Sequence, residues 1–100
     1  MILHININAK WLENDKDAID RLVNENMNWK LDQYLQKFEW DDKVCDLKLT
    51  LKKNKKSLFN GILQVIVDWK IFRYEREDYK KLDDLINHFF DHFKEELANS

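Results

Sequence analysis

The most constraining feature of this sequence is a change in the spacing of its apolar residues. From Cys45 to Leu51 an apolar residue occurs at every second position, with polar residues between them. Such alternation gives a β-strand one dry face and one wet face. On both sides of this central region, apolar residues recur at spacings of three and four, the period of a helix that buries one face. The pattern therefore predicts strands and helices in the same small protein.

Alternation of apolar and polar residues predicts three further strands. One covers Ile2–Ile7, and a second long strand covers Leu58–Val67, after the turn "KKNKKS". A last strand covers Ile71–Arg76, and Asp68–Lys70 is expected to be a tight connection into it.

Two segments have the helical period. The first predicted helix is about 20 residues long; Asn14 or Asp15 caps it, and it ends after Phe38, at "EWDDK". The last helix follows Tyr79, and we place Lys80 and Lys81 in its first turn, where the helix dipole disfavours cations. Its predicted buried stripe is Leu82, Leu85, Ile86, Phe89, Phe90, Phe93 and Leu97.

The predicted element order is β-α-β-β-β-α. Two helices with one apolar face each need one face of a sheet to cover. We therefore expect an α+β fold, a two-layer sandwich in which a four-stranded sheet carries both helices on one face. The first two strands can be parallel through a right-handed crossover, and the others pair as antiparallel hairpins. At 100 residues, the whole of 1–100 is expected to be a single domain.

Composition excludes several classes of protein. The chain has no proline and only one glycine, Gly61, which rules out glycine-rich nucleotide loops and flexible linkers. No apolar run reaches the roughly 20 residues that cross a bilayer, and the start "MILHININ" is unlike a signal peptide. A single cysteine forms no internal disulfide. We expect a cytoplasmic protein.

Candidates for catalysis and metal binding are few. Ser57 and Ser100 lie in no recognisable nucleophile motif, and Cys45 falls on the dry face of its strand, where a thiol is inert. His88 and His92 are four residues apart on the last helix, the spacing of a helical metal pair. They flank the core stripe, and no distant third ligand is evident. The sequence predicts a protein that is not an enzyme and that binds no cofactor and no metal. The alternative is a metal- or redox-linked role for Cys45, His88 and His92.

Charge is distributed unevenly along the chain. The net charge of −2 divides into −4 over residues 1–42, +6 over 43–81 and −4 over 82–100. Local fields, rather than net charge, attract polyanions. Clustered cations neutralise phosphates, and aromatic or arginine planes stack on unpaired bases. The alternative is a solvated hairpin tip whose lysines protect a sheet edge. The candidate RNA-binding residues are Lys30, Lys52, Lys53, Lys55, Lys56, Lys70, Arg73, Arg76, Tyr79, Lys80 and Lys81.

Three segments together resemble a known family. "KLDQYLQKF", from Lys30, is similar to the end of the first helix in the ribosome hibernation promoting factor and protein Y family. "VCDLKLTLKK" matches the family's second strand in position. "EDYKKLDDLINHFFDHFKEEL" is similar to the opening of its second helix, with Tyr79, Leu82 and Asp83 in register. The resemblance covers essentially the whole chain and looks like the short form of the family.

This resemblance implies a bacterial or organelle-type translation inhibitor. Such a factor binds the small ribosomal subunit in the channel for messenger and transfer RNA of idle ribosomes, through contacts with rRNA phosphates. It would be non-enzymatic, without cofactor, and monomeric off the ribosome. The alternative is a diverged, non-ribosomal interaction module that uses an aromatic surface of the sheet. Salt dependence separates the two, since phosphate binding weakens steeply with salt.

Overall fold

The computed structural model describes residues 2–9, 12–28, 44–67 and 70–99. The elements in chain order are β1 (Ile2–Ala9), the 3-10 turn η1 (Glu13–Asp15), α1 (Lys16–Asn26), β2 (Val44–Lys53), β3 (Phe59–Val67), β4 (Lys70–Tyr79) and α3 (Leu82–Ala98). The predicted strands are all present, with bounds that differ from the expected ones by a few residues.

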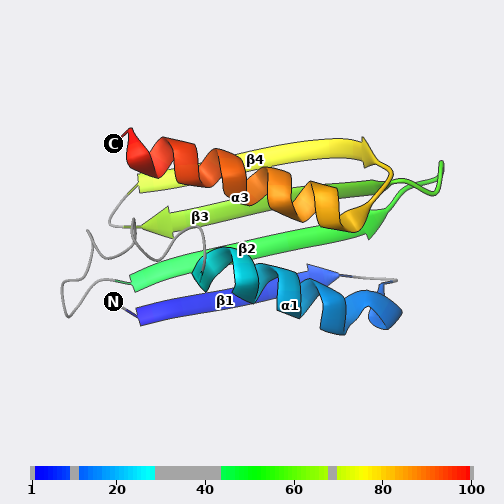
Figure 1. The fold of residues 1–100 in the computed structure, drawn as a ribbon, viewed down its shortest axis with the longest axis horizontal. Coiled ribbons are helices and arrows are strands. Elements are labelled where there is room, and N and C mark those ends of the chain that lie inside the picture. The colour runs from blue at the N-terminus through cyan, green and yellow to red at the C-terminus, as the bar shows by residue number, and fades with distance from the viewer. Residues whose placement is uncertain (1, 10–11, 29–43, 68–69, 100) are drawn as a thin grey trace.

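The four strands form one mixed sheet in the order β1-β2-β3-β4. β1 runs parallel to β2, whereas β2–β3 and β3–β4 are antiparallel. Val67 pairs with Lys70, so the connection from β3 to β4 is as short as predicted. Figure 1 shows α1 over the β1–β2 side and α3 over the β3–β4 side, both on the same face of the sheet. The predicted α+β sandwich is confirmed.

The core lies between this helix-covered face and the two helices. Alternate residues of β2, from Cys45 to Leu51, and of β3, from Leu63 to Val67, are buried, and their neighbours point to the other face. We call that other side the open face. The register Ile5↔Leu47 and Ile7↔Leu49 places Ile5 and Ile7 of β1 on the covered face too. Period-2 alternation thus sorts each strand into core and surface.

Three phenylalanines of α3 hold this helix on the sheet. Phe89, Phe90 and Phe93 are fully buried, and the ring of Phe93 meets that of Phe72 edge-on, with centroids 5.2 Å apart. Phe89 packs where β3 has Gly61: a Cβ built there would lie 2.8 Å from Phe89 Cε2 and 3.0 Å from Leu51 Cδ2. Because the single glycine of the chain has no side chain, it leaves the space that Phe89 of α3 occupies.

A buried amide joins the two helices. Asn26, at the end of α1, is 3% exposed. Its Nδ2 donates to Leu22 O at 2.8 Å and to Asn87 Oδ1 of α3 at 3.0 Å. Sequence reasoning missed this contact, because Asn26 is a polar residue beside an apolar stripe and its pattern is typical of a surface position.

The ends of the predicted helices need correction. Lys80 and Lys81 precede α3 rather than occupying its first turn: Lys81 is the N-cap, with an extended backbone, and Asp83 and Asp84 fill the first turn. The reason is that β4 continues to Tyr79, which pairs with Phe59 beyond a bulge. The acidic first turn suits the helix dipole.

The first helix is confirmed only in its N-terminal part. Asp15 occupies the N-cap, without a side-chain capping bond, and Asp17 lies in the first turn as expected. The predicted continuation to Phe38 and its end at "EWDDK" lie outside the described residues.

Replacing Gly61 by valine tests the packing of α3. Valine favours strands more than glycine does, so any destabilisation measures steric conflict with Phe89, Leu51 and Leu85. We expect Gly61→Val to lower the free energy of unfolding by about 1 to 3 kcal/mol in urea denaturation. Gln64→Val, on the open face of the same strand, is the control and should change it by less than about 0.5 kcal/mol. Equal effects of the two changes would contradict this account of the core.

Candidate nucleic-acid interface

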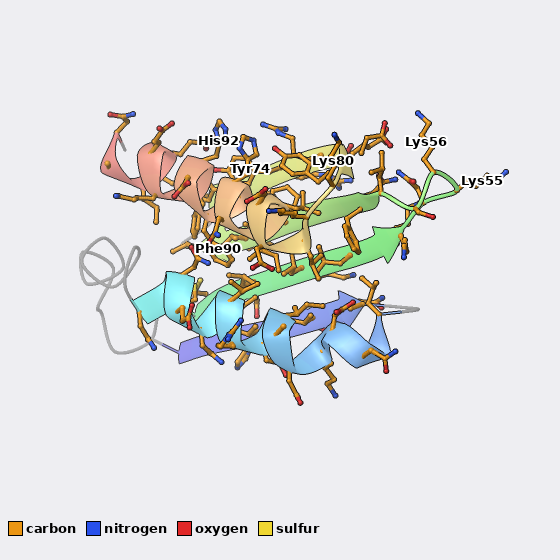
Figure 2. All side chains as sticks on the ribbon, turned by 45° about the vertical axis from the view of Figure 1, so that its right-hand side comes forward. Lys55, Lys56, Tyr74, Lys80, Phe90 and His92 are labelled. Carbon is orange, nitrogen blue, oxygen red and sulfur yellow. The ribbon has the colours of Figure 1, made fainter. Side chains whose placement is uncertain are left out.

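One end of the sheet gathers six of the predicted RNA-binding lysines. Strand pairing brings them together, because Lys53 lies opposite Phe59, which in turn lies opposite Tyr79. Figure 2 shows Lys55 and Lys56 at the tip of the β2–β3 hairpin, toward the same end of the molecule as Lys80. We call this cluster the hairpin end; it consists of Lys52, Lys53, Lys55, Lys56, Lys80 and Lys81, all exposed.

Asn54 closes the turn that carries the tip lysines. Its Oδ1 accepts the backbone N–H groups of Lys56 at 2.9 Å and Leu58 at 3.1 Å. Its own backbone N–H donates to Leu58 O at 2.8 Å, and its carbonyl accepts from the N–H of Ser57, a residue with positive φ. Short Asn side chains bond to nearby backbone in this way in turns. The tip therefore has a defined conformation.

The same asparagine ties the tip to β4. Asn54 Nδ2 donates to Asn60 Oδ1 at 2.9 Å and to Asp78 Oδ1 at 2.7 Å, and Asn60 Oδ1 also accepts the Asp78 N–H at 3.0 Å. Asp78 has φ 60° at the β4 bulge, and its Oδ2 lies 3.6 Å from Lys56 Nζ. The turn, the start of β3 and the end of β4 are thus held together beneath the lysines.

Much of the positive charge of the hairpin end is available to a partner. Among the described residues, Lys56 is the one member of the cluster in an ion pair, and Lys53 Nζ lies 6.0 Å from the centre of the Phe59 ring. Asp78 is already occupied by Asn54 and Lys56. The remaining lysines face solvent, where they can meet phosphate groups.

The other candidate residues do not join this cluster. Lys70 begins β4, about 30 Å along the strand from Tyr79 at about 3.3 Å per residue. Arg73 is on the open face and bonds Glu75 on its own strand. Arg76 lies opposite Gly61 and points to the helix side. Lys30 lies outside the described residues. The ten candidates within the described residues are therefore spread over several surfaces.

Arg76 instead belongs to a second group, which we call the histidine edge: Arg76, His88 and His92, with Tyr74 and Tyr79. Arg76 Nε donates to His88 Nε2 at 3.0 Å, and the rings of His88 and His92 meet edge-on with centroids 4.3 Å apart. Tyr79 and Tyr74 lie beside His88 and His92 respectively. The i, i+4 spacing of the histidines is visible in the sequence, but the contact of His88 with Arg76 is not, because it depends on α3 packing against the face of β4 that carries Arg76.

The open face of the sheet carries isoleucine rather than aromatic side chains. Ile71 is 68% exposed and lies opposite Ile66. The aromatic residues of the described strands, Phe59, Phe72, Tyr74 and Tyr79, are on the helix side, in or against the core. The four tryptophans lie outside the described residues. For the described part of the chain, the predicted alternative of an aromatic docking surface on the open face is therefore wrong.

The structure offers little for redox or metal chemistry. Cys45 is fully buried, and burial, with a smaller effect of the Asp46 charge, raises the pKa of its thiol to about 11. Within the described ranges no three His, Cys, Asp or Glu residues are grouped to hold a metal ion. No helix in those ranges is long and apolar enough to cross a membrane.

Comparison with known proteins gives an informative structural similarity. No family model matches the chain, and no curated protein does. The crystal structure of the N-terminal domain of protein Y from Thermus thermophilus is similar to it with a TM-score of 0.72 and 24% sequence identity. The match covers 99% of this chain and 98% of the other. The chain thus has the fold of that domain over its full length, the fold that the sequence motifs implied.

Asn54→Ala tests whether the asparagine orders the hairpin end. The change leaves the amides of Lys56 and Leu58 without their acceptor and removes the hydrogen bond from Asn54 to Asp78. We expect the free energy of unfolding to fall by about 1 kcal/mol, and amide hydrogen exchange to accelerate at residues 55–58 and 78. Asn8→Ala, on exposed β1, is the control. Unchanged exchange at the tip would refute the proposed role of Asn54.

Cys45 provides a test of core integrity. Because its thiol is buried and protonated at neutral pH, it should react with a thiol reagent only when the protein unfolds. Its labelling rate in native buffer should be orders of magnitude below that in denaturant. Rapid labelling of the native protein would contradict the packing of β2 described above.

Proposed function

We propose that this protein is a ribosome-associated hibernation factor. It binds rRNA of the small subunit in the channel for messenger and transfer RNA, and it inhibits translation by occupying that channel. The observation that carries the proposal is the similarity to the protein Y N-terminal domain over 99% of the chain. The family motifs at Lys30–Phe38 and around Tyr79 support it from the sequence.

The hairpin end supplies the proposed rRNA contact. Its six lysines come from the β2–β3 hairpin and from the connection between β4 and α3, and the network of Asn54, Asn60 and Asp78 fixes one segment against the other. A cluster held in place before binding loses less conformational entropy on association than six independent side chains on mobile loops. Point charges on flexible stems suit phosphate oxygens and RNA shape rather than base sequence.

The mechanism requires no chemical step. Inhibition follows from steric exclusion, since the bound protein and the messenger RNA or transfer RNA need the same space. The sandwich provides the necessary bulk, with a longest extent of 43 Å. The acidic end of α3 at Glu95 and Glu96 would face away from rRNA, whereas Asp83 and Asp84, next to Lys81, would limit the orientations in which the protein binds.

Removal of lysines from the hairpin end tests this proposal. The variant Lys55→Ala/Lys56→Ala/Lys80→Ala/Lys81→Ala should bind small subunits about tenfold or more weakly in co-sedimentation at moderate salt. The slope of log affinity against log salt should become shallower by about 0.7 to 0.9 for each phosphate that the variant no longer neutralises. Inhibition of a cell-free translation reaction should weaken in parallel.

A matched control separates local binding from net charge. Lys16→Ala/Arg21→Ala/Lys48→Ala/Lys94→Ala also removes four positive charges, from α1, the open face and α3. This variant should bind nearly as well as the parent protein. An equal decrease in affinity for both variants would show that the hairpin end is not the rRNA-binding surface, and failure of the parent protein to bind ribosomes at low salt would refute the function itself.

A further inference from the structure

We propose that Arg76, His88 and His92 form a proton-linked phosphate site at the edge between β4 and α3. It would take a phosphate group of RNA and bind it more tightly as the pH falls below neutral. The choice of RNA rests on the function proposed above, but the site itself does not. None of the lysines of the hairpin end belongs to it, and the two histidines are absent from the candidate residues that charge alone indicated.

The first step is the protonation state that the geometry requires. Arginine only donates hydrogen bonds, so the His88 Nε2 atom, 3.0 Å from Arg76 Nε, must be an acceptor. His88 is therefore neutral in this arrangement, with its ring proton on Nδ1. A second hydrogen bond, from Arg76 Nη1 to the carbonyl of Glu75 at 2.6 Å, fixes the direction of the guanidinium.

The second step concerns the groups that surround the histidines. Burial lowers the pKa of His88 below its ordinary value, and the nearby His92 and Arg76 lower it further, against an opposing effect of Asp91 on the same helix. From β4, the Tyr79 and Tyr74 rings face the pair. Burial, with Glu96 of α3, raises the pKa of Tyr74, so this tyrosine stays neutral. The cationic state of His88 is thus disfavoured in the free protein.

The third step follows from linkage. A group with a lowered pKa in the folded state makes the fold less stable as the pH falls through the ordinary histidine range. Protonated His88 also loses the bond from Arg76 and leaves cationic groups next to one another. A bound phosphate dianion or phosphodiester would offset that repulsion and accept hydrogen bonds from the guanidinium and both imidazoliums. Phosphate binding and proton uptake therefore promote one another.

The site is accessible from solvent. Arg76, His88 and His92 are each partly exposed, and Figure 2 shows His92 next to Tyr74, where α3 borders β4. A metal ion is the less suitable ligand, because the Nε2 atom of His88 already faces a guanidinium. Partial burial strengthens the interaction with an anion relative to one with a fully exposed lysine.

Histidine NMR titration tests the site directly. Long-range ¹H–¹⁵N spectra would give the pKa of His4, His88 and His92 in the free protein, with inorganic phosphate, and with an A-form RNA hairpin. We expect the pKa of His88 to rise with RNA, while His4, which pairs with Asp46 on the open face, stays unchanged. A rise in the pKa of His88 with inorganic phosphate but not with RNA would support the anion site and overturn its assignment to RNA. No rise with either would overturn the proposal.

Variants test the same linkage by affinity. RNA affinity should increase as pH falls from about 7.5 to 5.5, by up to about tenfold per pH unit for each proton taken up. His88→Gln/His92→Gln should abolish this dependence, and His4→Gln should retain it; persistence of the dependence in the double variant would refute the site. Arg76→Ala, measured by NMR, should raise the His88 pKa of the free protein and diminish the phosphate-induced rise.

These results are distinguishable from failure of the proposed function. Retention on small subunits at neutral pH depends on the hairpin end, whereas the histidine titration with inorganic phosphate needs no ribosome. A protein that binds no ribosomes but shows the His88 rise with phosphate would keep the anion site and lose the hibernation role. A protein that binds ribosomes but shows no rise in the His88 pKa with phosphate or RNA would support the hibernation role and refute the phosphate site.

Discussion

The close approach of α3 to the sheet is the interaction on which the rest of the structure depends. Phe89 packs against β3 where Gly61 has no side chain, and Phe93 meets Phe72 on β4. These contacts place α3 over β3 and β4, so the loop before α3 must cross the end of the sheet where the β2–β3 hairpin turns (Figure 1). The position of Lys80 and Lys81 beside the hairpin tip is therefore a consequence of core packing.

Which charged side chains lie together in this protein depends more on backbone geometry than on their closeness in the sequence. Residues 43–81 form one basic block in the sequence, yet the strands separate its members by face and by end. The bulge at Asp78 has the largest effect, because it brings Tyr79 to the helix side, beside His88, while Asp78 turns back toward Asn54. One local irregularity thus supports both the lysine cluster and the histidine edge. Bulges commonly redirect side chains in this way.

Most of the fold was predictable because the apolar residues of each strand and helix recur at a regular spacing. The alternation from Cys45 and the stripe of α3 need only local geometry to be recognised. The site was predictable in part: the lysines of the tip were expected together, since they are close in sequence. Lys70 and Arg73 could not be separated from them without knowing which end and which face of the sheet they occupy, and His88 could not be linked to Arg76 without knowing that α3 packs beside β4.

The sequence by itself determined the element types, their order and which side of each element is apolar, because these depend on the spacing of residues along the chain. It also determined the inert character of Cys45, through its place in the alternation. Only the tertiary structure decided that Lys80 and Lys81 lie before α3, that Asn54 joins three segments, and that Arg76 donates a hydrogen bond to His88. These outcomes depend on register and on the space at Gly61, which are properties of elements in contact rather than of any single segment.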